Sequence, residues 1–355
     1  MDSMAKSDRL VIAGVDAHVD SHHVAALDEQ GRLLGTAAFP ATASGHAALL
    51  VWLLALGQIG RIGVESTGSY AAGLVRFLTR HGVEALEINQ PHPHTRRQRG
   101  KSDTIDAEAA ARKTLTAERL AIPKDTSGAV ESIRMLRVAR EGAVKARAAA
   151  YNQLFELIVT APDELRERLT RKTLPGQATL CARLRPDHAR LHEPLQAAKL
   201  ALRSVAERSI ELDRDIHRLD KHLSLLVAAA APRTLSLLGV STGHASTLLV
   251  AAGQNIDRLH SEAAFSHLCA ANPIAASSGR TTRHRLNRGG NRDANRSLHM
   301  IAVVRLRYCQ RTRAYAERRT AEGLSKREII RCLKRYIARE IYHALRADLA
   351  DYSAT

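Results

Sequence analysis

The sequence predicts an α/β domain followed by helical segments, an α/β plus all-α fold class. Three observations predict it. Short apolar stretches separated by turn residues occur near the N-terminus, and apolar residues recur every three or four positions in the longer segments that follow. Aromatic residues make up only 3% of a chain that is 45% hydrophobic, so its cores should be aliphatic and favour helices. We expect domains at 8–125, 126–231 and 232–352.

The first domain mixes strands and helices. Three strands joined by short turns are expected at 10–16, 22–27 and 32–39. They are followed by a helix capped by Ser44 and ending at Leu56, a strand at 61–65, a helix at 70–81, a strand at 83–88 and a helix at 103–115. This order is expected of an RNase H-like domain, in which helices flank a mixed sheet. Periodicity alone supports only the broader α/β class.

Two long helices are predicted in the middle of the chain, at 128–159 and 193–230. Apolar or small residues recur along the second at steps of three or four, as in a coiled-coil seam. They are Leu202, Val205, Ser209, Leu212, Ile216, Leu219 and Leu223. The two helices form either a helical hairpin arm or part of an ordinary bundle.

The last domain is expected to be mainly helical. A glycine-bearing turn at 237–243 joins two short helices, either as a phosphate-binding hairpin or as a tight helix–helix turn. Further helices are expected at 261–271, 291–320 and 325–351, the last opened by a capping box. The segment 272–290 is expected to be an irregular polar loop.

Positive charge is concentrated in the last domain. The chain carries a net charge of +17, and the segment 280–346 holds 19 Lys and Arg against 5 Asp and Glu, a balance of +14. A field of this sign favours a polyanionic partner, and the excess of Arg over Lys suits phosphate. The alternative is a solvated basic surface. Nucleic acid is the expected partner.

Several classes of protein are disfavoured. No run of about 20 apolar residues is present, so no membrane span is expected. The N-terminus lacks a cleavable signal pattern, and we expect a cytoplasmic protein. Four scattered cysteines indicate reduced thiols rather than a zinc site or a disulfide framework. His22, His23, His92 and His94 are interpreted as surface or turn histidines.

Four acidic residues are candidates for a metal site. Asp16 and Glu65 each follow the apolar residues of a predicted strand, and strand ends are where sites form in α/β sheets. Asp103 and Asp106 lie one turn apart at the start of a predicted helix and share its face. In one interpretation, Asp103 caps the helix and the charge of Asp106 interacts favourably with the positive end of the helix dipole. In the other, the pair joins Asp16 and Glu65 in holding a divalent metal, with Mg²⁺ the first candidate.

Ser278 is a candidate nucleophile. It lies in a loop of small residues directly before Arg280, and Arg283 and Arg285 follow. A serine hydroxyl is a weak nucleophile at neutral pH, and nearby arginines would hold a phosphate and stabilise its transition state. The alternatives are a plain surface loop with basic neighbours, or a nucleophile at Ser277.

The chain resembles the Asp-Glu-Asp-Asp (DEDD) insertion-sequence transposases, the bridge-RNA-guided serine recombinases with a RuvC-like first domain and a C-terminal transposase domain. The N-terminal stretches that resemble the family are GVDAHVDSHH, VESTGSYAAGL and RRQRGKSDTIDAEAAAR. The C-terminal stretch is RLHSEAAFSHLCAANPIAASSGRTTRHRLNRGGNRDANRSLH. The resemblance covers most of the chain and is weakest in the helical arm. Departures from the family pattern include Gln254, Ala270 and Asn295.

The resemblance implies a transposase that exchanges DNA strands. Asp16, Glu65, Asp103 and Asp106 would be the catalytic, metal-binding acids, and Ser278 would attack DNA and keep the cut bond as a phosphoserine ester. The implied partners are element and target DNA, a structured guide RNA and further copies of the chain, from dimer to tetramer. The alternatives are a RuvC-like metal-dependent junction or nucleic-acid hydrolase in which Ser278 is not a nucleophile, or a non-catalytic scaffold.

A set of basic and polar residues is expected to bind nucleic acid. They are Arg96, Arg97, Arg99, Lys101, Arg280, Arg283, Arg285, Arg288, Asn291 and Arg296. Asn291 should also cap the helix that follows it. With so few aromatic residues, base stacking is not evident in the sequence, which agrees with delegation of sequence choice to a guide RNA.

Overall fold

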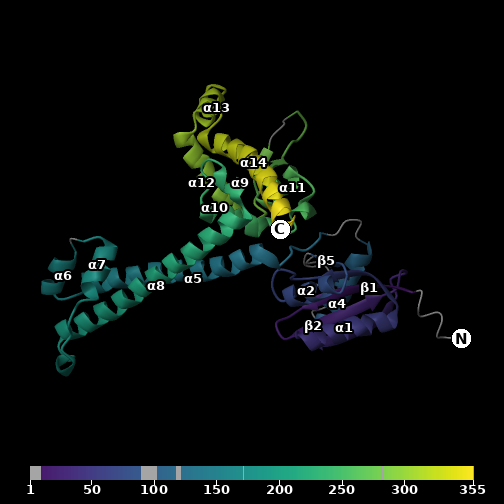
Figure 1. Cartoon of the computed structure of the whole chain (residues 1–355), viewed down its shortest axis with the longest axis horizontal. Helices are drawn as coiled ribbons and strands as arrows, with labels where there is room; N and C mark the ends of the chain where they lie inside the picture. The colour runs from purple at the N-terminus through teal and green to yellow at the C-terminus, as the bar shows by residue number, and fades with distance from the viewer. Residues whose placement is uncertain (1–8, 89–101, 117–120, 171, 281–283, 355) are drawn as a thin grey trace. The chain divides into compact units, whose positions relative to one another are not determined.

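The computed structural model describes residues 9–88, 102–116, 121–170, 172–280 and 284–354 (Figure 1). It divides into two compact units, each described below by itself. The first comprises residues 1–131 with 252–265, and the second residues 132–251 with 266–355. The division into three domains stays a prediction.

A five-stranded mixed sheet forms the centre of the first unit. Its strands are β1 Leu10–Ala17, β2 Ser21–Leu27, β3 Leu33–Pro40, β4 Gln58–Val64 and β5 Ala85–Glu87, in the order β3-β2-β1-β4-β5. The first three strands pair antiparallel, whereas β4 is parallel to β1 and β5 is parallel to β4. The expected mixed sheet is therefore confirmed.

Helices cover both faces of this sheet. Helices α1 Ala43–Leu56 and α2 Ala72–Arg80 pack on one face, and α4 Asp103–Thr116 packs on the other. Strand residues alternate between the two cores: Val24 faces α1 and α2, whereas Ala25 packs with Ala107 of α4.

The cap of α1 differs from the expectation. Thr42, not Ser44, is the N-cap residue, and its Oγ1 accepts a hydrogen bond from the backbone N of Gly45 at 3.1 Å. The backbone of Thr42 is extended, with φ −126° and ψ 166°, as an N-cap requires, whereas Ser44 already lies inside the helix. The extended backbone at Thr42, two residues after the end of β3, therefore sets the cap two positions earlier than expected.

Two long helices of the second unit pair with each other as an antiparallel hairpin (Figure 1). They are α5 Gly128–Val159 and α8 Pro194–Ala230, joined by the shorter helices α6 Asp163–Leu169 and α7 Leu174–Cys181 and the 3₁₀ turn η1 His188–Arg190. Three side-chain contacts show the antiparallel pairing: Arg140 with Asp220, Arg147 with Asp213, and Arg208 with Gln153. The predicted seam of α8 is largely buried, including Leu202, Ile216 and Leu223.

The rest of the second unit is mostly helical, and two expectations for it are wrong. The elements after α8 are α9 Pro232–Ser236, α10 Thr242–Ala252, η2 Ile256–Leu259, α11 Glu262–Leu268, α12 Arg292–Tyr308, α13 Gln310–Ala321 and α14 Lys326–Ala354. Of these, η2 and the first part of α11 belong to the first unit. The expected helix 291–320 is broken at Cys309, whose backbone is extended. The expected loop 272–290 contains an antiparallel hairpin, β6 Pro273–Ala275 and β7 His284–Leu286. Strands of three residues are too short to show a period.

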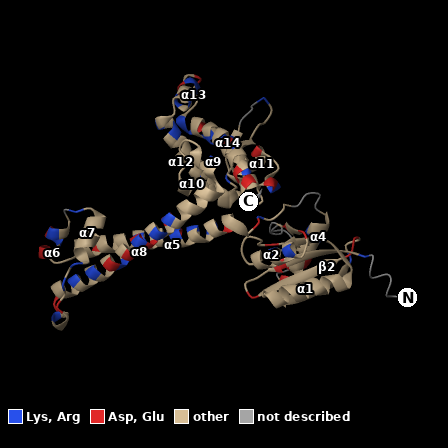
Figure 2. Cartoon of the chain, viewed as in Figure 1, with Lys and Arg blue, Asp and Glu red and all other residues tan. Residues whose placement is uncertain are grey.

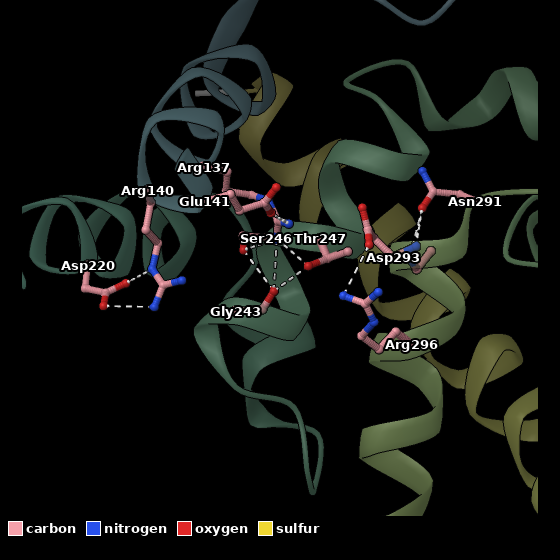
Figure 3. A network of polar contacts seen from close by, with 11 residues as sticks. Arg137, Arg140, Glu141, Asp220, Gly243, Ser246, Thr247, Asn291, Asp293 and Arg296 are labelled. Carbon is pink, nitrogen blue, oxygen red and sulfur yellow. Dashed lines mark hydrogen bonds and ion pairs between the residues drawn. The ribbon is translucent and has the colours of Figure 1, made fainter. Parts of the chain in front are cut away.

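The glycine-bearing turn before α10 is tightly packed. Gly239 has φ 84°, and a Cβ there would lie 3.3 Å from the carbonyl oxygen of Ile301 on α12. The guanidinium of Arg137 donates to the carbonyl of Gly243 and to the hydroxyls of Ser246 and Thr247 (Figure 3). These contacts are those of a helix–helix turn, and a phosphate-binding role stays a prediction.

Candidate metal centre and nucleic-acid surface

Asp16 lies near the end of β1, on the face of the sheet that α4 covers. Its neighbours Val15 and Ala17 belong to the core on the opposite face, and side chains alternate along a strand. Asp16 is 9% exposed. The strand therefore presents an almost buried carboxylate to the helix that carries Asp103 and Asp106.

Helix α4 brings Asp103 to this strand, and Asp103 does not cap the helix. The hydroxyl of Ser102 accepts a hydrogen bond from the backbone N of Ile105 at 3.3 Å. The carbonyl of Ser102 accepts another from the backbone N of Asp106 at 3.0 Å. The capping interpretation therefore applies to Ser102, and the carboxylate of Asp103 makes contacts outside its helix.

Two histidines contact the acidic residues. His18 was not a candidate from the sequence, and the interpretation of His23 as a surface or turn histidine omits its contact with Asp103. His18 Nε2 lies 3.2 Å from Asp16 Oδ2 and 3.4 Å from Asp103 Oδ1. His23 Nε2 lies 3.4 Å from Asp103 Oδ2. A signal existed, because His23 is the cross-strand partner of Asp16 and His18 follows Asp16 by two residues. Residues two apart on a strand share a face.

The interpretation of His22 as a surface histidine is wrong. His22 is fully buried on the other face of the sheet, where its Nε2 lies 3.2 Å from Nε2 of His46. Burial, followed by the neighbouring His46, lowers the pKa of His22 to about 4. His92 and His94 lie outside the described residues.

Glu65 follows β4 beside the same part of β1. Its backbone N donates to the carbonyl of Val15 at 3.0 Å, and the residue is 6% exposed. Val64 belongs to the core on the α1 and α2 face, so alternation directs Glu65 toward the α4 face. Ser66 then turns the chain in a left-handed conformation with φ 56°.

Burial and neighbouring charges both act on the carboxylate of Asp16. Burial raises the pKa of Asp16, and the charges of Asp106 and Asp103 raise it further, while His18 opposes the shift. Like charges held together in a partly buried place are costly unless a cation joins them. Asp106 is itself buried, with 5% of its surface exposed. The first unit thus brings Asp16, Asp103 and Asp106 into electrostatic contact.

The atoms present fit a divalent ion. One ligand atom each from Asp16, His18 and Asp103 lies within 4.8 Å of the others. Ligands on opposite sides of a Mg²⁺ ion are about 4.2 Å apart, so small side-chain movements would close the set on one ion. Carboxylate oxygens suit Mg²⁺, and an imidazole nitrogen adds preference for transition metals such as Mn²⁺.

Ser278 lies in the second unit, in the connection between β6 and β7. Ser278 is exposed, as are Ser277, Gly279 and Arg280. Gly279 has φ 56°, and no atom lies within 4 Å of a Cβ built there. The serine is thus open to a large substrate. The four acidic residues belong to the first unit, so the structure describes the two groups separately.

The basic residues expected to bind nucleic acid are partly described. Arg285 and Arg288 are exposed. Arg296 lies on α12, where its Nη1 is 3.7 Å from Oδ1 of Asp293 (Figure 3). Asn291 caps α12 as predicted, because its Oδ1 accepts from the backbone N of Asp293 at 3.0 Å. Lys and Arg residues also occur along α5 and α8 (Figure 2). Arg96, Arg97, Arg99, Lys101 and Arg283 lie outside the described residues.

Two family models match the chain. Residues 13–161, which include the four acidic residues, match the DEDD transposase model of IS110 elements, described as a transposase. Residues 231–317, which include Ser278, match a model described as the transposase IS116/IS110/IS902 family. The chain carries both IS110-family transposase domains. A comparison with curated proteins gives no match.

These transposase domains imply DNA binding and suggest DNA cleavage, and their DEDD name agrees with a metal-binding RNase H-like sheet. They show IS110-family DEDD transposase domains, and neither description names a serine recombinase, so that part of the resemblance is not shown. The roles of Ser278 and of a guide RNA stay predictions. Within the described part of the chain, no helix is long and apolar enough to cross a membrane.

Proposed function

We propose that the chain is an insertion-sequence transposase that cuts and exchanges DNA strands through Ser278, guided by a bridge RNA. The observation that carries the proposal is the meeting of Asp16, His18 and Asp103 at one end of β1, inside the matched DEDD region. Carboxylate oxygens gathered at one place are the ligands that hard divalent cations prefer.

Asp16, Glu65, Asp103 and Asp106 would hold the divalent ion, which we propose to be Mg²⁺. When bound, the ion supplies positive charge that neutralises a phosphate oxygen and orients the scissile group. His18, whose Nε2 contacts both Asp16 and Asp103, would add a nitrogen ligand. His23 would hold Asp103 in place, because its Nε2 contacts one of the two carboxylate oxygens. The burial of Asp16 and Asp106 excludes water from one side of the site.

Ser278 would make the first cut. Its Oγ attacks the phosphorus of a DNA strand, a new P–Oγ bond forms, and the bond between phosphorus and the 3′ oxygen breaks. The serine proton ends on the released 3′ hydroxyl. One phosphodiester replaces another, so that hydroxyl can later attack the ester on a partner strand without ATP. The exposed Arg280 and Arg285, close to Ser278 in the sequence, would stabilise the charge of the transition state.

The exposed position of Ser278 and its separation from the acids along the chain support an assembly of several copies. A homo-oligomer, from a dimer to a tetramer, would let an acid cluster and a serine from different copies meet at one DNA strand. The high positive charge of residues 280–346 supports contacts with DNA and with a guide RNA.

A second function is favoured by one observation. The acid cluster is formed by residues of the first unit alone, so it needs no residue of the second unit. A RuvC-like metal-dependent hydrolase, which uses water and not Ser278, is compatible with this arrangement. The two functions differ in whether a protein–DNA ester forms.

The deciding experiment traps that ester. The complete element with its flanking sequences is expressed with the wild-type chain, and covalent protein–DNA adducts are isolated in detergent and mapped by mass spectrometry. We expect the adduct on Ser278, none with Ser278→Ala, and a normal amount with Ser277→Ala. Asp106→Asn should abolish cutting while leaving DNA binding intact.

Continued cutting by Ser278→Ala would instead establish the hydrolase. An adduct on a tyrosine or on Ser277 would contradict the assignment of Ser278. Glu29→Gln serves as the matched control for the acids, since Glu29 is an exposed carboxylate in the turn between β2 and β3 and should leave cutting unchanged.

A further inference from the structure

A cavity of about 790 Å³ opens between the β6–β7 hairpin and helix α14 in the second unit. Pro273, Arg285 and Leu286 of the hairpin form one wall, and Lys334, Arg335 and Tyr336 of α14 form another. Its volume lies in the range of about 300–1,000 Å³ that suits a small ligand or one group of a larger one. The hairpin that forms this wall is the one that carries Ser278.

The cavity is strongly cationic. Arg285, Arg331, Lys334 and Arg335 line it, against the single carboxylate of Glu328. Arg331, Lys334 and Arg335 recur at the three- and four-residue spacing that places side chains on one face of a helix. Such a concentration of charge favours an anionic ligand.

Lys334 is the most informative of these cations. It is 6% exposed, and its Nζ donates to Asn295 Oδ1 at 3.0 Å. Asn295 is held in that orientation because its Nδ2 donates to the carbonyls of Cys269 and Ala270. Among the described residues, no carboxylate lies within ion-pair distance of the Lys334 ammonium. A buried ammonium has three donors and is costly without a counter-ion, which an incoming phosphate would supply.

An aromatic side chain stands beside the cations. Tyr336 lines the cavity and is 49% exposed, and its ring is oriented by an edge-to-face contact with Tyr315, 5.7 Å between centroids. An exposed ring next to phosphate-binding cations is the combination that holds an unpaired nucleotide, with the base on the ring and the phosphate on the cations.

We propose that this cavity binds one unpaired nucleotide of DNA, with its base against Tyr336 and its phosphate at Lys334 and Arg335. The choice of DNA rests on the proposed function, because the wall of the cavity is the hairpin that would carry the nucleophile. A nucleotide held here would anchor the strand while the adjoining phosphodiester reaches Ser278.

The test measures binding without cleavage. Fluorescence anisotropy of the full chain, in EDTA, compares a labelled eight-residue oligodeoxythymidine with a fully paired hairpin duplex. We expect Tyr336→Ala to weaken single-strand binding by about tenfold or more, the size of one lost stacking contact, with duplex binding unchanged. Tyr336→Phe keeps the ring and should stay within twofold of wild type.

Tyr308→Ala is the matched control, because Tyr308 is also exposed, at 62%, and is not among the residues that line the cavity. Its single-strand affinity should equal that of wild type. For the phosphate, the measured quantity is the slope of the logarithm of the single-strand binding constant against the logarithm of the salt concentration. Lys334→Met should make this slope less steep by about 0.7, the value of one lost phosphate contact. Circular dichroism checks that each variant is folded, and an iododeoxyuridine oligonucleotide should cross-link to Tyr336.

Unchanged binding by a folded Tyr336→Ala variant, or an equal loss in Tyr308→Ala, would overturn the proposal. A cross-link that maps outside the cavity would do the same. Tighter binding of RNA of the same sequence would overturn the choice of DNA. Since no strand is cut in EDTA, these outcomes are independent of whether Ser278 attacks DNA.

Discussion

Gly14 of β1 and Ala111 of α4 lie so close that a Cβ on Gly14 would be 2.0 Å from the backbone nitrogen of Ala111. The same Cβ would be 2.6 Å from the carbonyl oxygen of Ala107. Both neighbours are backbone atoms of a helix, which cannot move aside as a flexible side chain can. The missing side chain thus lets the helix of Asp103 and Asp106 rest on the strand of Asp16.

Substituting Gly14→Ala should destabilise the first unit by about 1–3 kcal/mol or more, because the added methyl must push α4 from the sheet. Urea unfolding followed by the fluorescence of Trp52, the only tryptophan and a residue of α1, reports on this unit. Gly68→Ala is the control, since no atom lies within 4 Å of a Cβ at Gly68. Equal effects of the two substitutions would contradict the role of Gly14.

Removing His18 should change the choice of metal. His18→Ala removes the nitrogen ligand that favours transition metals, so affinity for Mn²⁺ should fall by about tenfold or more and affinity for Mg²⁺ by less. Isothermal titration calorimetry with each metal measures both. His81→Ala, at an exposed histidine of the same unit, should leave both affinities unchanged. Parallel losses for the two metals would show that His18 is not a ligand.

The buried pair of His22 and His46 should make the first unit sensitive to acid. Burial lowers the pKa of both histidines, that of His22 from 6.5 to about 4. Between those values the unfolded chain binds a proton at residue 22 that the folded chain does not. Stability therefore falls as pH decreases from about 6.5 to about 4, by about 3 kcal/mol for His22.

Replacing the histidine tests this pH dependence. In His22→Leu the decrease in stability between pH 6.5 and pH 4 should be smaller than in wild type, as measured by urea unfolding with Trp52 fluorescence. His81→Gln should keep the wild-type pH dependence, because His81 is exposed. An unchanged pH dependence in His22→Leu would mean that other groups cause the acid sensitivity.

Thr42 should contribute more to the stability of α1 than Ser44. Thr42→Ala removes the hydroxyl that accepts from the backbone N of Gly45, at a cost of about 1 kcal/mol. Ser44→Ala loses an exposed hydrogen bond with the hydroxyl of Thr42 and should lower the free energy of unfolding by only a few tenths of a kcal/mol. The same fluorescence assay compares them, and a larger cost for Ser44→Ala would reverse the assignment.

The amino-acid sequence by itself determined the class of the fold and predicted the four acids. Strand and helix periods are local, so the order of elements in the first unit and the seam of α8 could be read without coordinates. Asp16, Glu65, Asp103 and Asp106 were candidates because each stands at the end or start of such an element. The charge of residues 280–346 was likewise visible as composition.

Only the tertiary structure decided which side chains meet. His18 and His23 become partners of the acids through the pairing of β1 with β2. His22, the neighbour of His23 on β2, points to the opposite face of the sheet and is buried there. The cavity beside Tyr336 exists because a hairpin of two three-residue strands closes over α14. Such contacts depend on distances between residues far apart in the chain, which no local pattern of hydrophobicity or charge encodes.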